Sequence, residues 1–390
     1  MSRLRIIWLC SWYPNRLDPY DGDFIQRHAR AASLYNDIHV IHVVADSSGA
    51  TKEPETVLNT GNGLTEQVVY FRKRDSVWGR FKARINYFFL FRKVLRNYVV
   101  KYGRPDAVHV QVPIKAGIPA LWFRKRYKVP YLVTEHWGIY NSIAEDHFGS
   151  RNRLFRYYTR KIFEKTSGFI SVSRYLAEGV NRMVCPLDFN VIPNVVDTKL
   201  FYPSDSRGER FRFIHVSNMA ALKNPGGIIR AFSSAYRANN SIELVMVGDR
   251  DPAIRDLASS QGLPENSIRF TGEKSYADVA REMQDSHCLV LFSNIENSPC
   301  VIGEALCCGL PVIATRVGGI PELLDTSCSI LTEPGDEKGL EKAMVEMIGR
   351  YKEFKSSVIS EAAVIKFGYE GAGLEMDRLY RRVVAGKIPD

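Results

Sequence analysis

Apolar runs alternate with amphipathic stretches along the first half of the chain. The runs that predict buried strands cover residues 4–10, 38–44, 107–112, 131–135, 168–172 and 190–192. Between several of them lie amphipathic stretches, such as residues 24–35 and 114–127, which predict helices. Strands that are apolar almost throughout and alternate with helices are typical of a parallel sheet covered on both faces. The polar residues 46–67 interrupt the alternation and predict a long loop or a hairpin.

The same alternation starts again after a break. Residues 193–212 contain two prolines, a glycine and several charges, which is typical of a linker between domains. Beyond it, strands are predicted at residues 212–216, 243–247, 267–270, 288–292, 311–314 and 327–331. Helices are predicted at residues 225–238, 252–261, 276–284 and 301–308, and the chain is predicted to be helical from residue 336 to near its end.

The length of 390 residues also favours two domains, because it exceeds what one compact core usually holds. We predict an α/β fold with two Rossmann-like, doubly wound parallel sheets. Residues 1–195 would form the first domain and residues 196–365 the second, with a C-terminal helix at 366–390 that could cross back onto the first. Ligands of open α/β sheets bind outside the carboxyl ends of the strands, so we expect the two sheets to face each other across a binding cleft.

Net charge points to an anionic partner. The chain carries 53 Lys and Arg against 43 Asp and Glu, a formal charge of +10. Residues 81–104 hold seven basic and no acidic residues, and residues 151–165 hold six basic residues and one Glu, both interleaved with aromatics. These stretches are either solvated amphipathic helices whose aromatics face a core, or a surface that rests on anionic lipid. No nucleic-acid-binding motif accompanies them, so we expect no nucleic-acid partner.

The seven cysteines include no CxxC pair, and no His, Cys and Asp cluster has the spacing of a metal site. We therefore expect neither a disulfide framework nor a bound metal. No apolar run approaches the roughly 18 residues of a membrane span. The run at residues 6–10 is shorter than the apolar core of a secretory signal. We expect a cytoplasmic protein that touches the inner face of the membrane at most peripherally.

The strongest chemical signal lies between Glu296 and Glu304. These two carboxylates bracket a short loop and a first helical turn, directly after a predicted strand. Backbone N–H groups around Ser298, Pro299, Cys300 and Val301, together with the positive end of the helix, could bind phosphate oxygens. Glu304 would accept hydrogen bonds from ribose hydroxyls, and Glu296 would reach a transferred sugar. On spacing alone, the alternative is two ordinary surface carboxylates.

At these residues the chain resembles the retaining glycosyltransferase family 4 of the GT-B fold. That family places two glutamates with seven residues between them here, as Glu296 and Glu304 are placed. Residues 311–322 look like its Gly-Gly-x-Pro-Glu loop, and residues 170–173 look like its strand-end serine motif, which carries Ser173. Residues 191–197 look like the signature before its linker, although Val195 stands where the family usually has glycine.

The resemblance implies roles for further residues. Lys223 matches a lysine that clamps the donor diphosphate, whereas Asn218 stands where the family has an arginine, a charge that Arg316, Arg174 or another basic residue would have to supply. In the first domain, Gly22 matches a loop glycine near donor phosphate and acceptor. His136 matches a strand-end histidine near the donor sugar. Two more residues of that domain, Glu135 and Ser173, are acceptor-side candidates.

The implied reaction moves a sugar from a nucleoside diphosphate sugar to the hydroxyl of a glycan or lipid-linked acceptor, with retention of configuration and no metal or cofactor. The second domain would bind the donor and the first the acceptor, and Lys223, Glu296 and His136 would be catalytic. A GT-B-fold sugar-nucleotide epimerase and a non-catalytic nucleotide-sugar binder remain as alternatives. A nicotinamide-dependent dehydrogenase is disfavoured, because no GxGxxG follows the first strand.

Overall fold

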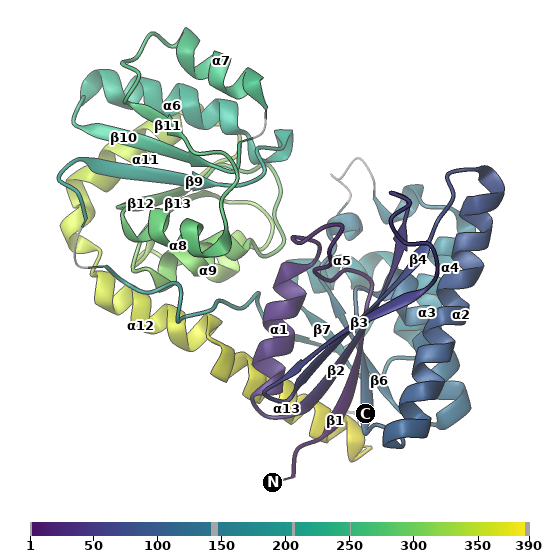
Figure 1. Ribbon diagram of the computed structural model, residues 1–390. Coiled ribbons are helices and arrows are strands. Elements are labelled where there is room, and N and C mark those ends of the chain that lie inside the picture. Colours follow the sequence, from purple (N-terminus) through teal and green to yellow (C-terminus); the bar gives the residue numbers. More distant parts are fainter. Residues whose placement is uncertain (1, 142–146, 205–206, 250, 387–390) are drawn as a thin grey trace. The chain divides into compact units, whose positions relative to one another are not determined.

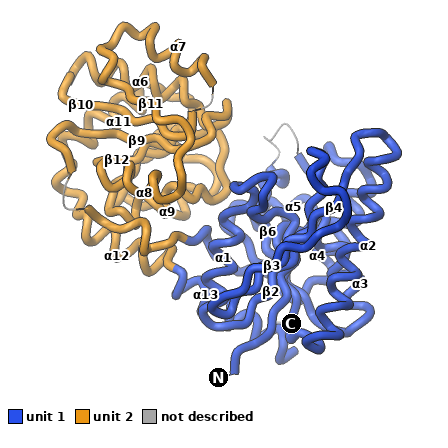
Figure 2. The backbone as a smooth tube through the Cα atoms, viewed as in Figure 1, with its two compact units in different colours: residues 1–195, 369–390 blue, residues 196–368 orange. Residues whose placement is uncertain are grey.

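The computed structural model describes residues 2–141, 147–204, 207–249 and 251–386 (Figure 1). The chain forms two compact units, one of residues 1–195 with 369–390 and the other of residues 196–368 (Figure 2). Each unit is an α/β sandwich around its own sheet, as the alternation of apolar and amphipathic segments predicts.

The first unit is built on an eight-stranded sheet in the order β3-β4-β2-β1-β5-β6-β7-β8. Its strands are β1 (Arg5–Cys10), β2 (Asp37–Asp46), β3 (Glu55–Gly61), β4 (Leu64–Arg72), β5 (Ala107–Gln111), β6 (Tyr131–Glu135), β7 (Phe169–Ser171) and β8 (Phe189–Val191). All neighbouring pairs are parallel except β3 with β4. The six predicted strands of this half are therefore confirmed.

The segment predicted as a long loop or a hairpin is a hairpin, and its second strand runs beyond the predicted limit. The turn consists of Asn62 and Gly63, both with positive φ (48° and 76°), which is the backbone that joins antiparallel strands tightly. The second strand, β4, pairs in parallel with β2, and its residues 68–71 are buried. The first strand, β3, is exposed along its whole length at the edge of the sheet.

Helices cover both faces of this sheet. One face packs on α1 (Asp23–Ser33) and α13 (Tyr369–Val384), through alternate β1 residues such as Ile6 and Trp8. The opposite face packs, through Ile7 and Leu9, on α2 (Val77–Tyr102), α3 (Pro113–Tyr127), α4 (Arg153–Glu164) and α5 (Arg174–Met183). Two short 3₁₀ turns, η1 (Gly138–Tyr140) and η2 (Phe148–Ser150), follow β6.

The C-terminal helix α13 belongs to the first unit and lies against α1. The contact is close at Gly373, where a Cβ atom would come within 2.2 Å of the Ala31 carbonyl oxygen. A residue from the last helix therefore reaches the sheet: the Tyr380 hydroxyl lies 2.7 Å from Nδ1 of His109 on β5.

The second unit is built on a six-stranded parallel sheet in the order β11-β10-β9-β12-β13-β14. Its strands are β9 (Phe211–Val216), β10 (Ile242–Val247), β11 (Ile268–Phe270), β12 (Cys288–Leu291), β13 (Val312–Thr315) and β14 (Ser329–Thr332). Its helices are α6 (Pro225–Ala238), α7 (Pro252–Ser260), α8 (Tyr276–Gln284), α9 (Cys300–Cys307), α10 (Ile320–Leu323), α11 (Glu337–Arg350) and α12 (Ser356–Phe367), with 3₁₀ turns η3 (Ala221–Lys223) and η4 (Tyr351–Glu353).

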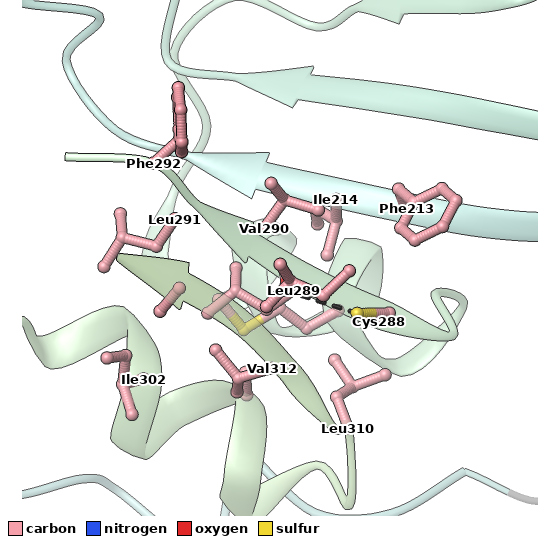
Figure 3. Close-up of a cluster of buried hydrophobic side chains, with 14 of the residues drawn as sticks. Phe213, Ile214, Cys288, Leu289, Val290, Leu291, Phe292, Ile302, Leu310 and Val312 are labelled. Atoms are coloured by element: carbon pink, nitrogen blue, oxygen red, sulfur yellow. Dashed lines mark hydrogen bonds between the residues drawn. The ribbon is translucent and has the colours of Figure 1, made fainter. Parts of the chain in front are cut away.

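The core of the second unit explains why its strands read as continuous apolar runs. All four residues of β12 are buried, because helices cover the sheet on both sides. Figure 3 shows these side chains packed between Ile214 of β9, Val312 of β13 and Ile302 of α9. The packing fixes where β12 ends and where α9 begins, and the loop between them carries Glu296. Among the described residues, no helix is long and apolar enough to cross a membrane.

Candidate functional site

Lys223 and Glu296 form an ion pair at the carboxyl ends of two neighbouring strands. Lys223 ends η3 in the loop that leaves β9, and Glu296 lies in the loop that leaves β12. The Lys223 Nζ lies 2.5 Å from Oε1 of Glu296, and the two side chains are 21% and 9% exposed. A hydroxyl also holds the carboxylate, since Ser293 Oγ donates to the same oxygen at 2.9 Å. The pair therefore combines a fixed geometry with a lysine that solvent still reaches.

Hydrogen bonds to backbone carbonyl groups tie three loops together around this pair. The Asn294 N–H donates to the Leu222 carbonyl at 2.8 Å, which joins the β12 loop to η3. The Gly319 N–H donates to the Glu296 carbonyl at 3.1 Å, and Thr315 Oγ1 donates to the carbonyl of Ser293 at 2.6 Å. The Gly-Gly-x-Pro-Glu stretch found in the sequence thus braces the first of the two glutamates.

The second glutamate lies on α9, which starts just beyond that loop. Helix α9 begins at Cys300 after Pro299, and no side chain caps it. Glu304 is 3% exposed, and its Oε1 accepts a hydrogen bond of 3.0 Å from the Tyr276 hydroxyl at the start of α8. The tyrosine is a partner that the sequence motif does not include. The start of a helix carries partial positive charge, so this loop and helix are suited to an anion.

The loop between β9 and η3 carries Asn218 at the position where an arginine is expected. Asn218 is exposed, and its Oδ1 accepts a hydrogen bond from the Ala220 N–H at 3.2 Å, which stabilises the local turn. Gly248 shows how tightly the neighbouring loop approaches, because a Cβ there would lie 2.1 Å from the Ser217 carbonyl oxygen. This loop is therefore compact and backbone-rich, but it offers no cation at residue 218.

Each of the two arginines named as substitutes has a contact within its own unit. Arg316 follows β13 and forms an ion pair with Glu333, with Nε 3.4 Å from Oε1. Arg174 belongs to the first unit, where its guanidinium lies 5.6 Å from the centre of the Phe189 ring. That Arg316, Arg174 or another basic residue supplies the charge missing at Asn218 stays a prediction.

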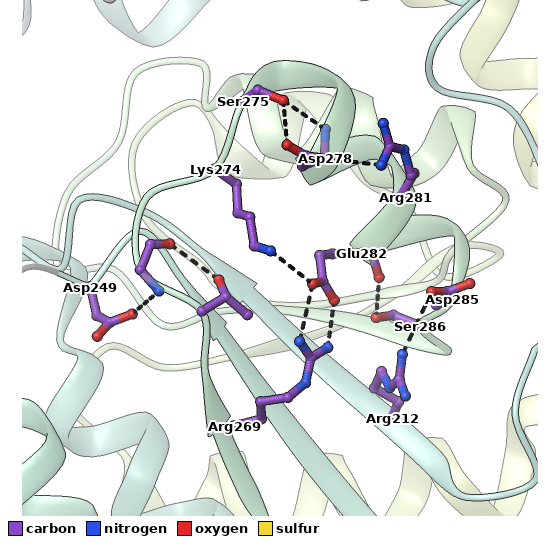
Figure 4. Close-up of polar contacts among 12 residues, drawn as sticks. Arg212, Asp249, Arg269, Lys274, Ser275, Asp278, Arg281, Glu282, Asp285 and Ser286 are labelled. Atoms are coloured by element: carbon purple, nitrogen blue, oxygen red, sulfur yellow. Dashed lines mark hydrogen bonds and ion pairs between the residues drawn. The ribbon is translucent and has the colours of Figure 1, made fainter.

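A polar network that sequence reasoning missed lies around β10, β11 and α8. Asp249 accepts hydrogen bonds from the Gly272 N–H at 2.7 Å and from Arg255 Nε at 2.7 Å. Figure 4 shows Glu282 of α8 holding Arg269 and Lys274 together. These residues have no recognisable spacing, because the contacts join four separate elements. They fix the loops after β10 and β11 beside the loop that follows β9.

In the first unit, Gly22 is required by the backbone. It precedes α1 with φ 64° and ψ 32°, the left-handed region that glycine adopts without strain. A Cβ atom there would also come within 2.8 Å of the carbonyl carbon of Trp12. The left-handed backbone of Gly22 and its lack of a side chain allow the loop after β1 to lie close to the start of α1, as the predicted glycine-containing loop requires. They explain the glycine without any ligand.

Glu135, predicted as an acceptor contact, is fully buried at the end of β6. Its Oε1 accepts from the His136 and Trp137 N–H groups, both at 2.8 Å, and its Oε2 accepts from the Tyr140 hydroxyl at 2.7 Å. Burial raises the pKa of this carboxyl to about 7, against the lowering effect of those three donors. The geometry assigns Glu135 to the β6–η1 turn that orients His136, because its carboxylate has no exposed surface.

His136 is buried within a group of histidines. Its Nε2 lies 3.0 Å from Oε1 of Gln111, and its ring meets that of His28 at 5.5 Å, edge to face. Burial lowers the pKa of His136 well below 6.5, and the nearby His28 and His109 lower it further. The pKa values of His28 and His109 are each lowered to about 3, again mainly by burial. These imidazoles are therefore neutral at pH 7.

The histidine group connects to the C-terminal helix. Nε2 of His109 lies 2.6 Å from Thr134 Oγ1 and its Nδ1 lies 2.7 Å from the Tyr380 hydroxyl, while the Gln111 amide nitrogen lies 3.3 Å from the same ring. A polar chain thus runs from α13 through His109 and Gln111 to His136. None of these contacts has a sequence signature, because they join β5, β6 and α13.

Ser173, the other acceptor-side candidate, caps a helix. Its Oγ accepts a hydrogen bond from the Leu176 N–H at 3.2 Å at the start of α5. Within each unit, the structure brings Lys223 to Glu296 and Glu135 to His136, whereas Asn218 and Ser173 serve local turns and caps. In the part of the chain that the structure describes, no group of three or more His, Cys, Asp or Glu residues could hold a metal ion.

Comparisons with known proteins agree with the architecture. The family model described as "Glycosyl transferases group 1" matches residues 210–350, and the one described as "Glycosyltransferase Family 4" matches residues 25–200. The fold of this chain is similar to the structure of a sucrose-phosphate synthase from Thermosynechococcus elongatus, with a TM-score of 0.77, 20% identity and coverage of 98% and 100% of the two chains. It is also similar to Anabaena Alr3699/HepE in complex with UDP, with a TM-score of 0.73, 18% identity and coverage of 97% and 100%.

Curated relatives match over different shares of their length. N-acetyl-alpha-D-glucosaminyl L-malate synthase of Bacillus anthracis is 26% identical over 62% of this chain and 65% of its own. The putative teichuronic acid biosynthesis glycosyltransferase TuaC of Bacillus subtilis is 23% identical over 90% and 89%. The alpha-monoglucosyldiacylglycerol synthase of Streptococcus pneumoniae is 22% identical over 57% and 54%. The chain thus spans just under two thirds of the first of these relatives and about half of the third.

Proposed function

This chain belongs to the group 1 glycosyltransferases with the GT-B fold, and from that premise we propose that it moves a sugar from a nucleoside diphosphate sugar to an acceptor hydroxyl with retention of anomeric configuration. The second unit binds the donor and the first unit binds the acceptor. The product belongs to polysaccharide or glycolipid assembly, and no metal or cofactor takes part.

One observation carries this proposal: Lys223 is paired with Glu296 in the loop that leads into α9. The loops after β9 and β12 together bring a cation, a carboxylate and the positive end of a helix to the carboxyl edge of one parallel sheet. A diphosphate needs the cation and the helix end, and a sugar hydroxyl needs the carboxylate. A structural ion pair alone would not require the Gly319 amide and the Ser293 hydroxyl to fix the orientation of Glu296.

The chemistry follows from where charge develops. The bond between the sugar and the diphosphate stretches, so the sugar becomes oxocarbenium-like and negative charge grows on the leaving phosphate. The Lys223 ammonium and the backbone amides at the start of α9 stabilise that charge, because they are oriented before the reaction begins. Glu296 orients the sugar hydroxyls, and Glu304 holds the ribose. The acceptor hydroxyl attacks from the face that the phosphate leaves, which retains the configuration, and the leaving phosphate takes the proton.

His136 contributes as a neutral group. Because burial lowers its pKa well below 6.5, the ring donates or accepts a hydrogen bond to the sugar or the acceptor without carrying charge. Gln111 and the Glu135-braced turn keep the ring in place. This leaves Lys223 as the cationic side chain assigned to the leaving group.

The names of the relatives support the proposed classes of donor and acceptor. The relatives include enzymes named for N-acetylglucosaminyl transfer, for teichuronic acid biosynthesis and for synthesis of a glucosyl lipid. Solved neighbours carry UDP, UDP-glucose or ADP. We therefore propose a nucleoside diphosphate sugar as donor and a glycan or a lipid-linked sugar as acceptor, with the base and the sugar left to experiment.

The test is a donor panel. The protein is incubated with UDP-, GDP- and ADP-sugars, with and without lipid and oligosaccharide acceptors, and release of the nucleoside diphosphate is measured together with the anomeric configuration of the product. Acceptor-dependent release and a product with the anomeric configuration of the donor are expected. An isomerised sugar formed from donor alone would favour the epimerase alternative. Tight donor binding without release under any condition would favour the non-catalytic binder.

A further inference from the structure

Helix α2 of the first unit has an unusual composition. Its 26 residues include seven Lys or Arg and no Asp or Glu. Ser76 caps its start, with the Ser76 side chain accepting a hydrogen bond from the Gly79 N–H at 3.0 Å. The helix is therefore a stable element whose charge is of one sign along its whole length.

The first half of α2 presents apolar side chains to solvent. Trp78, Phe81, Ile85 and Phe89 are 75%, 56%, 40% and 64% exposed. Their spacing of three, four and four residues places them along one side of the helix. The buried residues of α2 lie mainly in its second half, where Phe91, Val94, Leu95 and Tyr98 reach the core. A stripe of large exposed apolar side chains on a single helix marks an interaction surface.

A basic groove begins where this stripe ends. It has a volume of about 730 Å³ and lies between α2, the end of β4 and residues 52–54. Its cations are Lys52, Arg72, Arg92, Lys93 and Arg96, and among the residues that the structure describes no Asp or Glu lines it. Apolar surface comes from Phe71, Leu90 and Phe89, the last of which also belongs to the stripe. The groove therefore joins a cationic wall to an apolar floor.

The groove cations have no acidic partner in the part of the chain that the structure describes: none of the five appears in an ion pair there. Arg92 and Arg96 instead stack on Trp122 of α3, at 4.8 and 5.5 Å from the ring centre. The stacking holds both guanidinium groups beside the groove without neutralising them. Five uncompensated cations around one hollow favour an anionic ligand.

We propose that this face of α2 docks on an anionic membrane, with the groove holding the phosphate of a lipid headgroup and the Trp78–Phe89 stripe entering the boundary between headgroups and acyl chains. Cations alone would also suit a free phosphate or a nucleic acid. The Trp78–Phe89 stripe favours a lipid over these two ligands. An apolar side chain next to a phosphate site gains free energy only from a ligand that also offers apolar surface. The docking surface is independent of donor binding in the second unit.

The experiment measures co-sedimentation of the full chain with vesicles of phosphatidylcholine alone and with vesicles of phosphatidylcholine and phosphatidylglycerol in equal parts. Binding to the anionic vesicles only is expected, and it should weaken as salt rises. The R92E/K93E/R96E variant should bind on the order of 100-fold more weakly, since each basic residue at a lipid surface contributes about fivefold and three are lost. A second variant, W78S/F81S, keeps every charge and should also lose vesicle binding.

The matched control reverses three exposed lysines of the second unit, K338E/K342E/K352E, which change the net charge by the same amount. It should bind vesicles as the wild type does, and unfolding temperatures of all variants should match. Equal binding to both vesicle types, an equal loss in the control, or no loss in W78S/F81S would each overturn lipid docking. Displacement from vesicles by inorganic phosphate at constant ionic strength would assign the groove to a free phosphate instead. Equal affinity for single-stranded RNA would assign it to nucleic acid.

Discussion

The candidate residues of the two units differ in how they meet solvent. In the second unit, Lys223 and Glu296 keep their charges in a pair whose lysine is partly exposed. In the first unit, His28, His109 and His136 are buried, and burial lowers their pKa values so that they are neutral at pH 7. The difference suggests a division of labour: fixed charge for a charged diphosphate, and neutral polar groups for sugar and acceptor hydroxyls.

The physical reason lies in the cost of burial. A charged group removed from water must find a partner of opposite charge, and a neutral imidazole needs only hydrogen bonds. The second unit supplies that partner at 2.5 Å and leaves the ammonium within reach of solvent and ligand. The first unit supplies hydroxyls and amides, such as Tyr380 and Gln111.

Removal of the Lys223 charge should have the largest effect. We expect Lys223→Ala to lower kcat/KM by about 100- to 1,000-fold, the usual cost of losing one group that stabilises developing negative charge. Steady-state kinetics with the preferred donor measures it. The control is Lys274→Ala, which removes a partly exposed lysine of the same unit that pairs with Glu282. Equal losses in the two variants would contradict a specific role for Lys223.

His136→Ala should cost less, about 10- to 100-fold in kcat/KM, because it removes a neutral hydrogen-bonding group. Since the pKa of His136 lies well below 6.5, its protonation should not lower the rate between pH 8 and 7. The control His39→Ala removes another histidine of the same sheet, whose Nε2 lies 3.0 Å from Gln67. A rate that falls with an apparent pKa near 7 in the wild type, but not in a His136→Asn variant, would show a charged catalytic histidine and break the contrast.

Acid should destabilise the first unit before the second. A histidine whose pKa is lowered on folding binds its proton more readily in the unfolded chain, so its contribution to stability is complete above pH 6.5 and is lost as pH falls below it. Buried histidines with lowered pKa values in the first unit include His28, His42, His109 and His136, whereas the second unit has two, His215 and His287.

Glu135 opposes this trend only in part. Burial raises its pKa to about 7, so its contribution is complete below pH 4.5 and is lost as pH rises toward 7. Asp21, whose pKa burial raises to about 6, acts in the same direction as Glu135. Between pH 6.5 and 5, the five histidines with lowered pKa values, His39 included, outweigh these two carboxyls. Hydrogen exchange followed by mass spectrometry at pH 7 and at pH 5, corrected for intrinsic rates, should show protection lost first in β5 and β6. Earlier loss in β9 and β12 would contradict the prediction.

The smallest effects come from two tyrosine hydroxyls that serve the two units in parallel. Tyr276→Phe removes the donor to Glu304, and Tyr380→Phe removes the hydroxyl beside His109. Each should cost about 1 kcal/mol, the usual value of one hydrogen bond. We expect Tyr276→Phe to weaken donor binding about fivefold, measured by calorimetry. Tyr380→Phe should leave donor affinity unchanged and lower the unfolding temperature. The reverse assignment would show that the two networks are not separate.

The sequence predicted the parts that depend on local pattern. The sheet strands other than the β3–β4 hairpin were visible as apolar runs, because both faces of each sheet are covered by helices. A hairpin was one of two alternatives for residues 46–67, but the extent of β4 was not predicted, since polar Thr65, Glu66 and Gln67 precede its buried half. Its place between β3 and β2 comes from pairing with β2. The turn residues Asn62 and Gly63 were the available signal.

Contacts between segments far apart in the chain could not be predicted from the sequence. Lys223 and Glu296 could be named from motifs, but their direct pairing depends on how the loops after β9 and β12 meet. The chain from Tyr380 through His109 to Gln111 joins three elements and leaves no spacing to recognise. Glu135 was named as an acceptor-side candidate from its place beside His136, and only the structure shows that the turn after β6 folds back over its carboxylate.

Calorimetric titration of the protein with nucleoside diphosphates is the most direct test of diphosphate binding at Lys223 and the start of α9. One of UDP, GDP or ADP should bind the wild type, with affinity reduced at least tenfold in Lys223→Ala and in Glu304→Ala and unchanged in His136→Ala. If none of them binds, or if binding survives both second-unit variants unchanged, the diphosphate is not held there.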